Sequence, residues 1–167
     1  MVELKRLIRD VPDFPRRGIL FRDISPLLRE HFEETIQALD GLLTEAEWSE
    51  IDAVAGVESR GFILGAALAA RRRKGFVLVR KQGKLPPPVV DVAYDLEYGS
   101  SVLEMQCGHG RLLLVDDVLA TGGTMTASAE LCVRAGYEIR AIAALIDLKI
   151  VADYRWRALA ARTAVHY

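Results

Sequence analysis

The sequence contains one short segment whose residue types suit the binding of a phosphorylated sugar. After the apolar run 112–115 it reads Asp116, Asp117, Val118, Leu119, Ala120, Thr121, Gly122, Gly123 and Thr124. Glycines lack a Cβ atom, so their backbone N–H groups can approach an anion closely. The two threonines add hydroxyl donors, and a helix that begins here would present its positive N-terminal end. Residues 120–124 are therefore predicted to bind a phosphate group.

Asp116 and Asp117 have a different predicted role. Carboxylates repel phosphate, but they accept hydrogen bonds well from the diol of a sugar. A phosphate pocket beside a diol pocket describes a ribose 5-phosphate. A lone pair of aspartates or glycines would instead indicate an acidic strand end and an ordinary helix cap. The complete order of strand, acids, glycine turn and helix favours the sugar phosphate.

Other motifs for phosphate or covalent chemistry do not occur in the sequence. There is no GxxxxGK[ST] motif, and the segment 108–110 lacks the third glycine and the following helix of a dinucleotide fingerprint. His31, His109 and His166 are too far apart to suggest a metal cluster. No serine or cysteine dyad indicates a covalent intermediate. Nucleotide hydrolysis and hydride transfer are thus disfavoured.

The pattern of apolar residues predicts the elements that position this segment. Buried strands are expected where short apolar runs are bounded by glycine or charge, at residues 51–57, 76–79, 111–115 and 139–146. Helices are expected where apolar residues recur at helical spacing, over residues 26–48, 61–73 and 124–135. Gly136 is expected to cap the last helix. Strands that alternate with helices predict an α/β fold with a parallel sheet.

Two further segments flank this pattern. Residues 1–25 mix charge with prolines and a glycine, which predicts a short helix followed by an extended flap. Residues 81–100, with several prolines and glycines, are predicted to form an irregular lid loop. With 167 residues the chain is long enough for one domain, residues 1–167, and too short for two ordinary ones.

Composition limits the partners of the chain. Lys and Arg total 22 against 23 Asp and Glu, so no net positive field favours binding to nucleic acid or an anionic membrane. No run of about 18 uninterrupted apolar residues suggests a membrane span. Cys107 and Cys132 form neither a CxxC pair nor a disulfide framework, so a reducing cytoplasm is expected.

With these residues in place, the sequence resembles the type I phosphoribosyltransferases, whose signature is an apolar strand, two acids and a turn containing TGGT. Further blocks make it similar to the adenine phosphoribosyltransferases: VPDFP (11–15), GILFRDISPLL (18–28), ESRGF (58–62), VRKQGKLP (79–86) and LEYG (96–99). The blocks extend from Ile8 to about Leu148 in the order of the family. The resemblance implies a single-domain fold with a mostly parallel, twisted sheet flanked by helices, an N-terminal hood and a flexible lid.

The resemblance also implies a reaction, in which adenine and phosphoribosyl pyrophosphate give AMP and pyrophosphate in purine salvage. Displacement of pyrophosphate builds positive charge on the sugar and negative charge on the leaving group. Asp116 and Asp117 would hold the ribose, near the first charge. The second would be neutralised by Mg²⁺, held mainly by the substrate without direct protein ligands, and by basic residues. The residues expected at the pyrophosphate are Ser59, Arg60, Arg80, Lys81 and Lys84.

Ser59 and Arg60 directly follow a predicted strand, where the family contacts pyrophosphate through backbone N–H groups and often has a non-proline cis peptide. Taken alone, Glu58 and Arg60 would indicate a surface ion pair, which the surrounding blocks make less favoured. The basic run 71–74 indicates a solvated helix end that complements the helix dipole, with no catalytic part.

The resemblance also implies which residues contact the base and which residue of the lid takes part in the reaction. Phe21 would stack on adenine, main-chain groups of Leu20 and Arg22 would read its edge, and Leu148 would cover the other face. A buried core position is the alternative for Phe21. Glu97 lies in the lid, where closure would exclude water, raise the pKa of its carboxyl group and allow proton exchange with the purine.

Some residues depart from the family pattern and leave alternatives open. Pro87 stands where the family usually has glycine, and the connection 107–110 is short. Lys149 beside Leu148 would favour a 6-oxo group, so hypoxanthine or guanine remains an alternative to adenine. A non-catalytic regulator that senses phosphoribosyl pyrophosphate is a third possibility, although no helix-turn-helix accompanies the domain. The family also implies a homodimer in which Arg80 reaches the neighbouring site.

Overall fold

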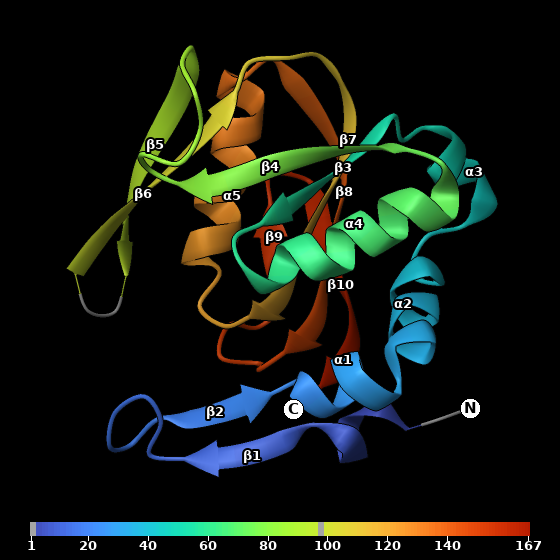
Figure 1. Ribbon diagram of the computed structural model, residues 1–167, viewed down its shortest axis with the longest axis vertical. Coiled ribbons are helices and arrows are strands. Elements are labelled where there is room, and N and C mark those ends of the chain that lie inside the picture. Colours follow the sequence, from blue (N-terminus) through green and yellow to red (C-terminus); the bar gives the residue numbers. More distant parts are fainter. Residues whose placement is uncertain (1–2, 97–98) are drawn as a thin grey trace.

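The computed structural model describes residues 3–96 and 99–167 (Figure 1). The predicted flap is a short 3-10 helix, η1 (Leu4–Leu7), followed by the antiparallel strands β1 (Arg9–Pro12) and β2 (Leu20–Asp23). These strands lie at one end of the molecule, apart from the main sheet (Figure 1). The predicted short helix and extended flap are thus present.

The single helix predicted over residues 26–48 is wrong, because the structure has three. They are α1 (Ser25–Glu30), α2 (Phe32–Asp40) and α3 (Glu45–Ser49). The first break is at His31, whose φ of −136° and ψ of 37° are not helical. A capping box between Thr44 and Glu47 starts the third helix anew. Most of the apolar stripe that suggested one helix is nevertheless packed in the core, although Phe32 is exposed.

The main sheet has eight strands in the order β5-β6-β4-β3-β7-β8-β10-β9. Its central pairs, β4-β3, β3-β7, β7-β8 and β8-β10, are parallel, and the outer pairs are antiparallel. The bounds of the strands are β3 (Ala53–Val57), β4 (Gly75–Lys81), β5 (Val89–Leu96), β6 (Gly99–Gln106), β7 (Gly110–Leu119), β8 (Tyr137–Asp147), β9 (Arg155–Trp156) and β10 (Leu159–His166). The predicted α/β fold with a mostly parallel sheet is confirmed.

Two helices cover opposite faces of this sheet, α4 (Arg60–Arg72) in front and α5 (Gly123–Arg134) behind it (Figure 1). A hydrophobic core lies on each face of the sheet, and alternate residues of β7 point into one or the other. Leu113 packs in the core beneath α4, and Leu114 packs in the core beneath α5. Helix α5 ends as predicted, since Gly136 follows it with a φ of +100°. Each helix therefore begins close to the carboxyl end of a buried strand.

The segment 81–100 is not the irregular loop that its prolines and glycines predicted. It contains a turn, then β5 and the start of β6, which pair in an antiparallel hairpin along their whole described length. Val92 and Leu103 are buried against α5, so an apolar face outweighs the loop-forming residues nearby. Glu97 and Tyr98, which were assigned to the lid, lie outside the described residues.

The basic run 71–74 is also not simply solvated. Arg71 Nη1 lies 2.5 Å from Glu33 Oε1, and Arg72 Nη2 donates to Asp40 Oδ2 at 2.8 Å. Arg72 also bonds to Glu45. These ion pairs of Arg71 and Arg72 connect the end of α4 to α2 and α3.

No helix in the described ranges, residues 3–96 and 99–167, is long and apolar enough to cross a membrane.

The two cysteines are expected to differ sharply in reactivity. Cys107 is exposed, whereas Cys132 is buried in α5 and burial raises the pKa of its thiol to about 12. Because the thiolate is the reactive form, native protein should react with one equivalent of an aromatic disulfide reagent, and with two after denaturation. The Cys107→Ser variant should lose the native reaction. Rapid modification of both thiols in native protein would contradict the buried position of Cys132.

Candidate active site

Asp116 and Asp117 lie near the end of β7, which continues beyond them to Leu119. Their residues are only 8% and 7% exposed, and the Asp117 N–H donates to Asp116 Oδ1 at 2.8 Å. Burial, and then the neighbouring charge of Asp117, raise the pKa of Asp116 well above its ordinary value. Two carboxyl groups held this closely are unfavourable for folding, which is typical of residues kept for binding or catalysis.

The turn predicted to hold phosphate follows directly and leads into α5. Gly122 adopts a φ of +85°, and Gly123 is the first residue of the helix. The ring of Tyr154 covers Gly122 so closely that an ideal Cβ there would be 2.5 Å from the ring carbons Cδ2 and Cε2. The hydroxyl groups of Tyr154 and Thr126 are hydrogen-bonded at 2.8 Å. Tyr154 therefore supports both the turn and the first part of the helix.

Arg60, at the start of α4, connects the flap with the end of β7. Its Nη2 lies 2.8 Å from Asp117 Oδ2, and its guanidinium carbon lies 5.1 Å from the centre of the Phe21 ring. Helix α4 can approach β7 here because Gly61 has no side chain: a Cβ would be 2.9 Å from Val115 O. The peptide bond between Glu58 and Ser59 is cis. The structure thus brings three predicted site residues into one cluster.

Glu58 is paired with the end of β4 and the turn that follows it, and not with Arg60. Its carboxylate accepts hydrogen bonds from Lys84 Nζ at 2.6 Å and from the Lys81 N–H at 2.9 Å. Burial favours the neutral acid, but these bonds and the charge of Arg80 lower the pKa of Glu58. Three basic residues predicted to meet pyrophosphate are therefore gathered beside Glu58.

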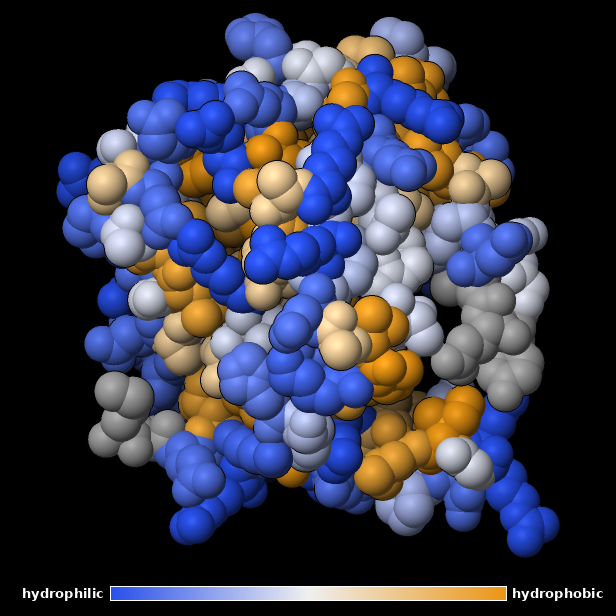
Figure 2. Space-filling view, turned by 180° about the vertical axis from the view of Figure 1, so that it is seen from behind, coloured by the Kyte–Doolittle hydropathy of each residue, from blue (hydrophilic) through white to orange (hydrophobic). Residues whose placement is uncertain are grey.

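The residues predicted to contact the base lie on the flap and after β8. Phe21 is half-buried and packs edge-on against Phe14, with ring centres 5.1 Å apart. Leu20 is 46% exposed, and the guanidinium carbon of Arg22 lies 3.7 Å from the centre of the Tyr167 ring. Seen from behind, the molecule is hollowed between the flap and the body, on the side of β5 and β6 (Figure 2). Leu20 and Phe21 are thus both partly exposed on the flap.

Two buried polar atoms in this region have no hydrogen-bond partner among the described residues. They are Arg80 Nε and Asp117 Oδ2. Arg80 Nε is 3.5 Å from Glu58 Oε2, and Asp117 Oδ2 is close to Arg60, but neither pair is aligned as a hydrogen bond. Buried polar groups are nearly always hydrogen-bonded, so unpaired ones at a strand end indicate a position for a polar ligand.

Comparison with known proteins agrees with this geometry. A family model of the phosphoribosyl transferase domain matches residues 30–162. The adenine phosphoribosyltransferase of Hydrogenovibrio crunogenus is 48% identical over 98% of this chain and 96% of its own length. The chain belongs to the adenine phosphoribosyltransferase family.

Solved structures of the family have the same fold. The crystal structure of the adenine phosphoribosyltransferase from Rhodothermus marinus aligns with a TM-score of 0.87 and 44% identity, covering 98% of this chain and 96% of that one. The Saccharomyces cerevisiae adenine phosphoribosyltransferase, crystallised with adenine and an imino-altritol bisphosphate, aligns with a TM-score of 0.86 and 35% identity, covering 97% and 96%.

Lys149 is the residue that left a 6-oxopurine as an alternative to adenine. Its ammonium lies 2.9 Å from Asp147 Oδ2, and this hydrogen bond raises the pKa of Lys149. Leu148 is half-buried beside it, and its N–H donates to Leu119 O at 3.0 Å. The charge of Lys149 is thus already compensated within the protein. Pro87 precedes Pro88 through a cis bond, and no contact described here explains the proline at this position.

Sequence reasoning missed two residues that the structure places against the turns of the candidate site. Tyr154 covers the glycine turn after β7 from the loop after β8, and nothing near it in the sequence indicates that contact. Glu104 in β6 is only 3% exposed and accepts hydrogen bonds from the turn that follows β4. A single carboxylate among Val102, Leu103 and Met105 was the available signal, because an acid inside an apolar strand needs a partner.

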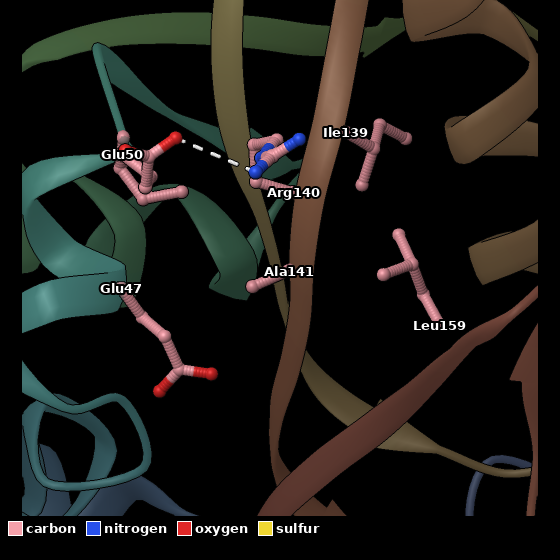
Figure 3. Close-up of a pocket in the computed structure, with 7 residues that line it drawn as sticks. Glu47, Glu50, Ile139, Arg140, Ala141 and Leu159 are labelled. Atoms are coloured by element: carbon pink, nitrogen blue, oxygen red, sulfur yellow. Dashed lines mark hydrogen bonds and ion pairs between the residues drawn. The ribbon is translucent and has the colours of Figure 1, made fainter.

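A cavity of about 330 Å³ lies elsewhere, lined by Glu47, Glu50, Ile51, Ile139, Arg140, Ala141 and Leu159 (Figure 3). In Figure 3 Glu50 and Arg140 point toward one another, and their closest charged atoms are 3.4 Å apart. Glu47 is paired with Arg162. This cavity lies where β8 begins, whereas ligands of open α/β sheets bind at the carboxyl ends of strands. It shares no residue with the predicted site.

Gly122→Ala is expected to destabilise the protein by about 1–3 kcal/mol, because an alanine would combine positive φ with a clash against Tyr154. Gly123→Ala is the matched control, since Gly123 begins a helix and its nearest neighbour, Asp95 O, is 3.6 Å from an ideal Cβ. The control should stay within about 0.5 kcal/mol of the parent. Urea unfolding of the three proteins measures the difference. Equal stabilities would contradict the described turn.

Proposed function

We propose that this chain transfers the phosphoribosyl group of phosphoribosyl pyrophosphate to adenine, giving AMP and pyrophosphate. The observation that carries the proposal is the buried pair Asp116 and Asp117, followed by the glycine turn and approached by Arg60. In the reaction the bond from the anomeric carbon to pyrophosphate breaks and the bond to adenine N9 forms. The N9 proton is released.

The carboxylates and the turn would hold the sugar phosphate. Asp116 and Asp117 would accept hydrogen bonds from the ribose hydroxyl groups and stabilise positive charge on the ring as the leaving group departs. Main-chain N–H groups and side chains of the turn would bind the 5-phosphate, at the positive end of α5. The residues assigned to the phosphate are Ala120, Thr121, Gly122, Gly123 and Thr124.

Basic residues around Glu58 would receive the pyrophosphate. Arg80, Lys81 and Lys84 are near this carboxylate, and Lys84 would exchange its bond to Glu58 for one to a phosphate oxygen. Ser59 and Arg60 would contact the same group from the start of α4. The unpaired Arg80 Nε supports this assignment, because a phosphate oxygen would provide its missing acceptor.

Phosphoribosyltransferases generally use Mg²⁺ together with phosphoribosyl pyrophosphate. When bound with the substrate, Mg²⁺ neutralises the leaving group. The residues fit this requirement, since Asp117 Oδ2 is a buried carboxylate oxygen without a hydrogen-bond partner among the described residues, and hard cations prefer such oxygens. Asp116 and Asp117 would be the nearby carboxylates, while the substrate would supply most of the ligands of the ion.

The base would bind between the flap and the loop after β8. Phe21 offers an aromatic face, Leu20 and Arg22 offer main-chain groups for the purine edge, and Leu148 would cover the opposite side. Arg22 is fixed by an ion pair with Asp10 and by the Tyr167 ring, so this part of the flap is preorganised. Stacking between Phe21 and adenine is consistent with the half-buried state of this ring.

Adenine is favoured over a 6-oxopurine by the ion pair of Lys149. A lysine that recognised a 6-oxo group would have to give up its bond to Asp147, which lies 2.9 Å away. Incubation with Mg²⁺, phosphoribosyl pyrophosphate and one purine at a time tests the proposal through pyrophosphate release. Release with adenine alone supports it. Release with hypoxanthine or guanine would show a 6-oxopurine enzyme, and binding without turnover would show a regulator.

Glu97 is proposed to exchange the proton of the purine when the lid closes. A nearby carboxyl group with a raised pKa is suited to this step. The Glu97→Gln variant should therefore turn over more slowly at saturating substrates, measured by AMP formation. Full turnover in this variant would remove the assignment.

The remaining assignments concern the assembly and the compartment. We propose a homodimer in which Arg80 reaches toward the neighbouring site, a single domain over residues 1–167, and a cytoplasmic location. Gel filtration with light scattering measures the assembly, and a monomeric active enzyme would contradict the dimer.

A further inference from the structure

Glu104 has an unusual position for a carboxylate, in the middle of β6 and almost completely covered. The residue is 3% exposed. Its Oε2 accepts a hydrogen bond from the Gly83 N–H at 2.9 Å, and its Oε1 accepts two, from the Lys84 N–H at 2.6 Å and the Leu85 N–H at 2.7 Å. Three consecutive main-chain donors thus converge on one side chain.

The turn held in this way carries the proposed pyrophosphate contacts. Arg80 lies directly opposite Glu104 in the antiparallel pair β4-β6, and its Nη1 donates to Lys84 O at 3.3 Å. The side chain of Lys84 extends to Glu58, next to Ser59. Gly83 and Lys84 are exposed, so without Glu104 their N–H groups would be left to solvent. The turn would then keep fewer bonds, among them the one from Arg80 Nη1 to Lys84 O.

We propose that Glu104 is a positioning residue of the transfer reaction, which holds the turn 83–85 so that Arg80 and Lys84 face the leaving pyrophosphate. The inference rests on the proposed function of the site. Glu104 itself does not touch the substrate. It acts through the main chain of the turn, because a charged acceptor that receives several N–H bonds is held more strongly than a neutral one.

This role can be separated from a simple effect of charge. A negative charge close to the pyrophosphate site repels the substrate, so the Glu104→Gln change considered as charge alone should lower the KM for phosphoribosyl pyrophosphate. Loss of positioning should instead raise the KM for phosphoribosyl pyrophosphate. A glutamine presents an NH₂ group to at least one of the three N–H donors and breaks that bond. The Glu104→Asp variant keeps the charge but is shorter, so it cannot reach all three.

The experiment compares the parent protein with E104Q, E104D and the control D91N. Asp91 pairs with Glu104 across β5-β6 but is exposed, so D91N removes a neighbouring carboxylate without disturbing the buried one. Steady-state rates with adenine give separate KM values for the two substrates. We expect both Glu104 variants to raise the KM for phosphoribosyl pyrophosphate at least about tenfold and to leave the KM for adenine within about twofold, since only the pyrophosphate contacts move. D91N should resemble the parent.

Amide hydrogen exchange measured by NMR provides a second readout that does not need catalysis. The N–H groups of Gly83, Lys84 and Leu85 should exchange at least about tenfold faster in E104Q than in the parent, because hydrogen bonding is what protects them. A lower KM for phosphoribosyl pyrophosphate in E104Q, or equal changes in both KM values, overturns the proposal. Unchanged exchange also overturns it. A parent protein without any turnover would refute the proposed function and, with it, a role of Glu104 in the reaction, whereas faster exchange in E104Q would still show that Glu104 holds the turn.

Discussion

The Asp117→Asn variant is expected to lose at least about 100-fold in kcat/KM for phosphoribosyl pyrophosphate while it remains folded. Asp117 Oδ2 is buried, lacks a hydrogen-bond partner among the described residues and lies 2.8 Å from the Arg60 guanidinium. Asparagine has almost the same shape, so packing is retained. It has no negative charge, however, and cannot stabilise the positive charge that develops on the ribose.

Kinetic measurements with circular dichroism of the same samples test this expectation. Asp91→Asn is a suitable control, because it removes an exposed carboxylate from the same domain. An Asp117→Asn protein with the parent rate would refute the role assigned to the end of β7. A variant that has lost its native spectrum would show that Asp117 contributes to folding, and a lower rate in it would then carry no information on catalysis.

Asp116→Asn is expected to make the protein more stable at neutral pH although it becomes a poorer enzyme. Burial and the charge of Asp117 raise the pKa of Asp116, so its ionised form is unfavourable in the folded state. Asparagine removes that cost. It can still accept the hydrogen bond from the Asp117 N–H, which is 2.8 Å long in the parent protein. We expect the free energy of unfolding to rise by an amount on the order of 1–3 kcal/mol, the usual cost of burying an uncompensated polar group.

The gain should depend on pH in a defined direction. Between the ordinary pKa of an aspartate and the raised pKa of Asp116, the folded parent protein binds more protons than the unfolded chain, so its stability falls as pH rises. Below this window Asp116 is neutral in both states, and the variant has no advantage. Above it the advantage is complete. Urea unfolding from acid to neutral pH measures the difference, and an advantage that is constant or shrinks with rising pH would contradict the raised pKa.

These two aspartates show how stability and function oppose one another in this site. The sheet would be more stable with neutral side chains at the end of β7, yet the proposed chemistry requires negative charge beside the ribose. Arg60 offsets part of the repulsion through its contact with Asp117 and joins the flap to the sheet through Phe21. Loss of Arg60 would therefore affect both substrates.

Contacts between residues far apart in the sequence explain most of the differences between the predicted and the observed helices and strands. The helix predicted over 26–48 is divided at His31, where the backbone leaves the helical region although the apolar spacing continues. The hairpin β5-β6 forms in a segment rich in proline because Val92 and Leu103 pack on α5. Strand β10 pairs in parallel with β8, and no feature of its own sequence identified it. Local pattern cannot report which distant surface will cover a segment.

The sequence alone determined the glycine turn 120–124, the two acids before it and the helices that follow the strands. These features depend on neighbouring residues: glycine permits the backbone of the turn, and a strand followed by a helix places the turn at the sheet edge. Only the tertiary structure decided that Arg60 bridges Asp117 and Phe21, that Tyr154 covers Gly122, and that Glu104 holds the turn after β4. Each of these contacts joins residues far apart in the chain, and their geometry exists only after the sheet and its covering helices have packed together.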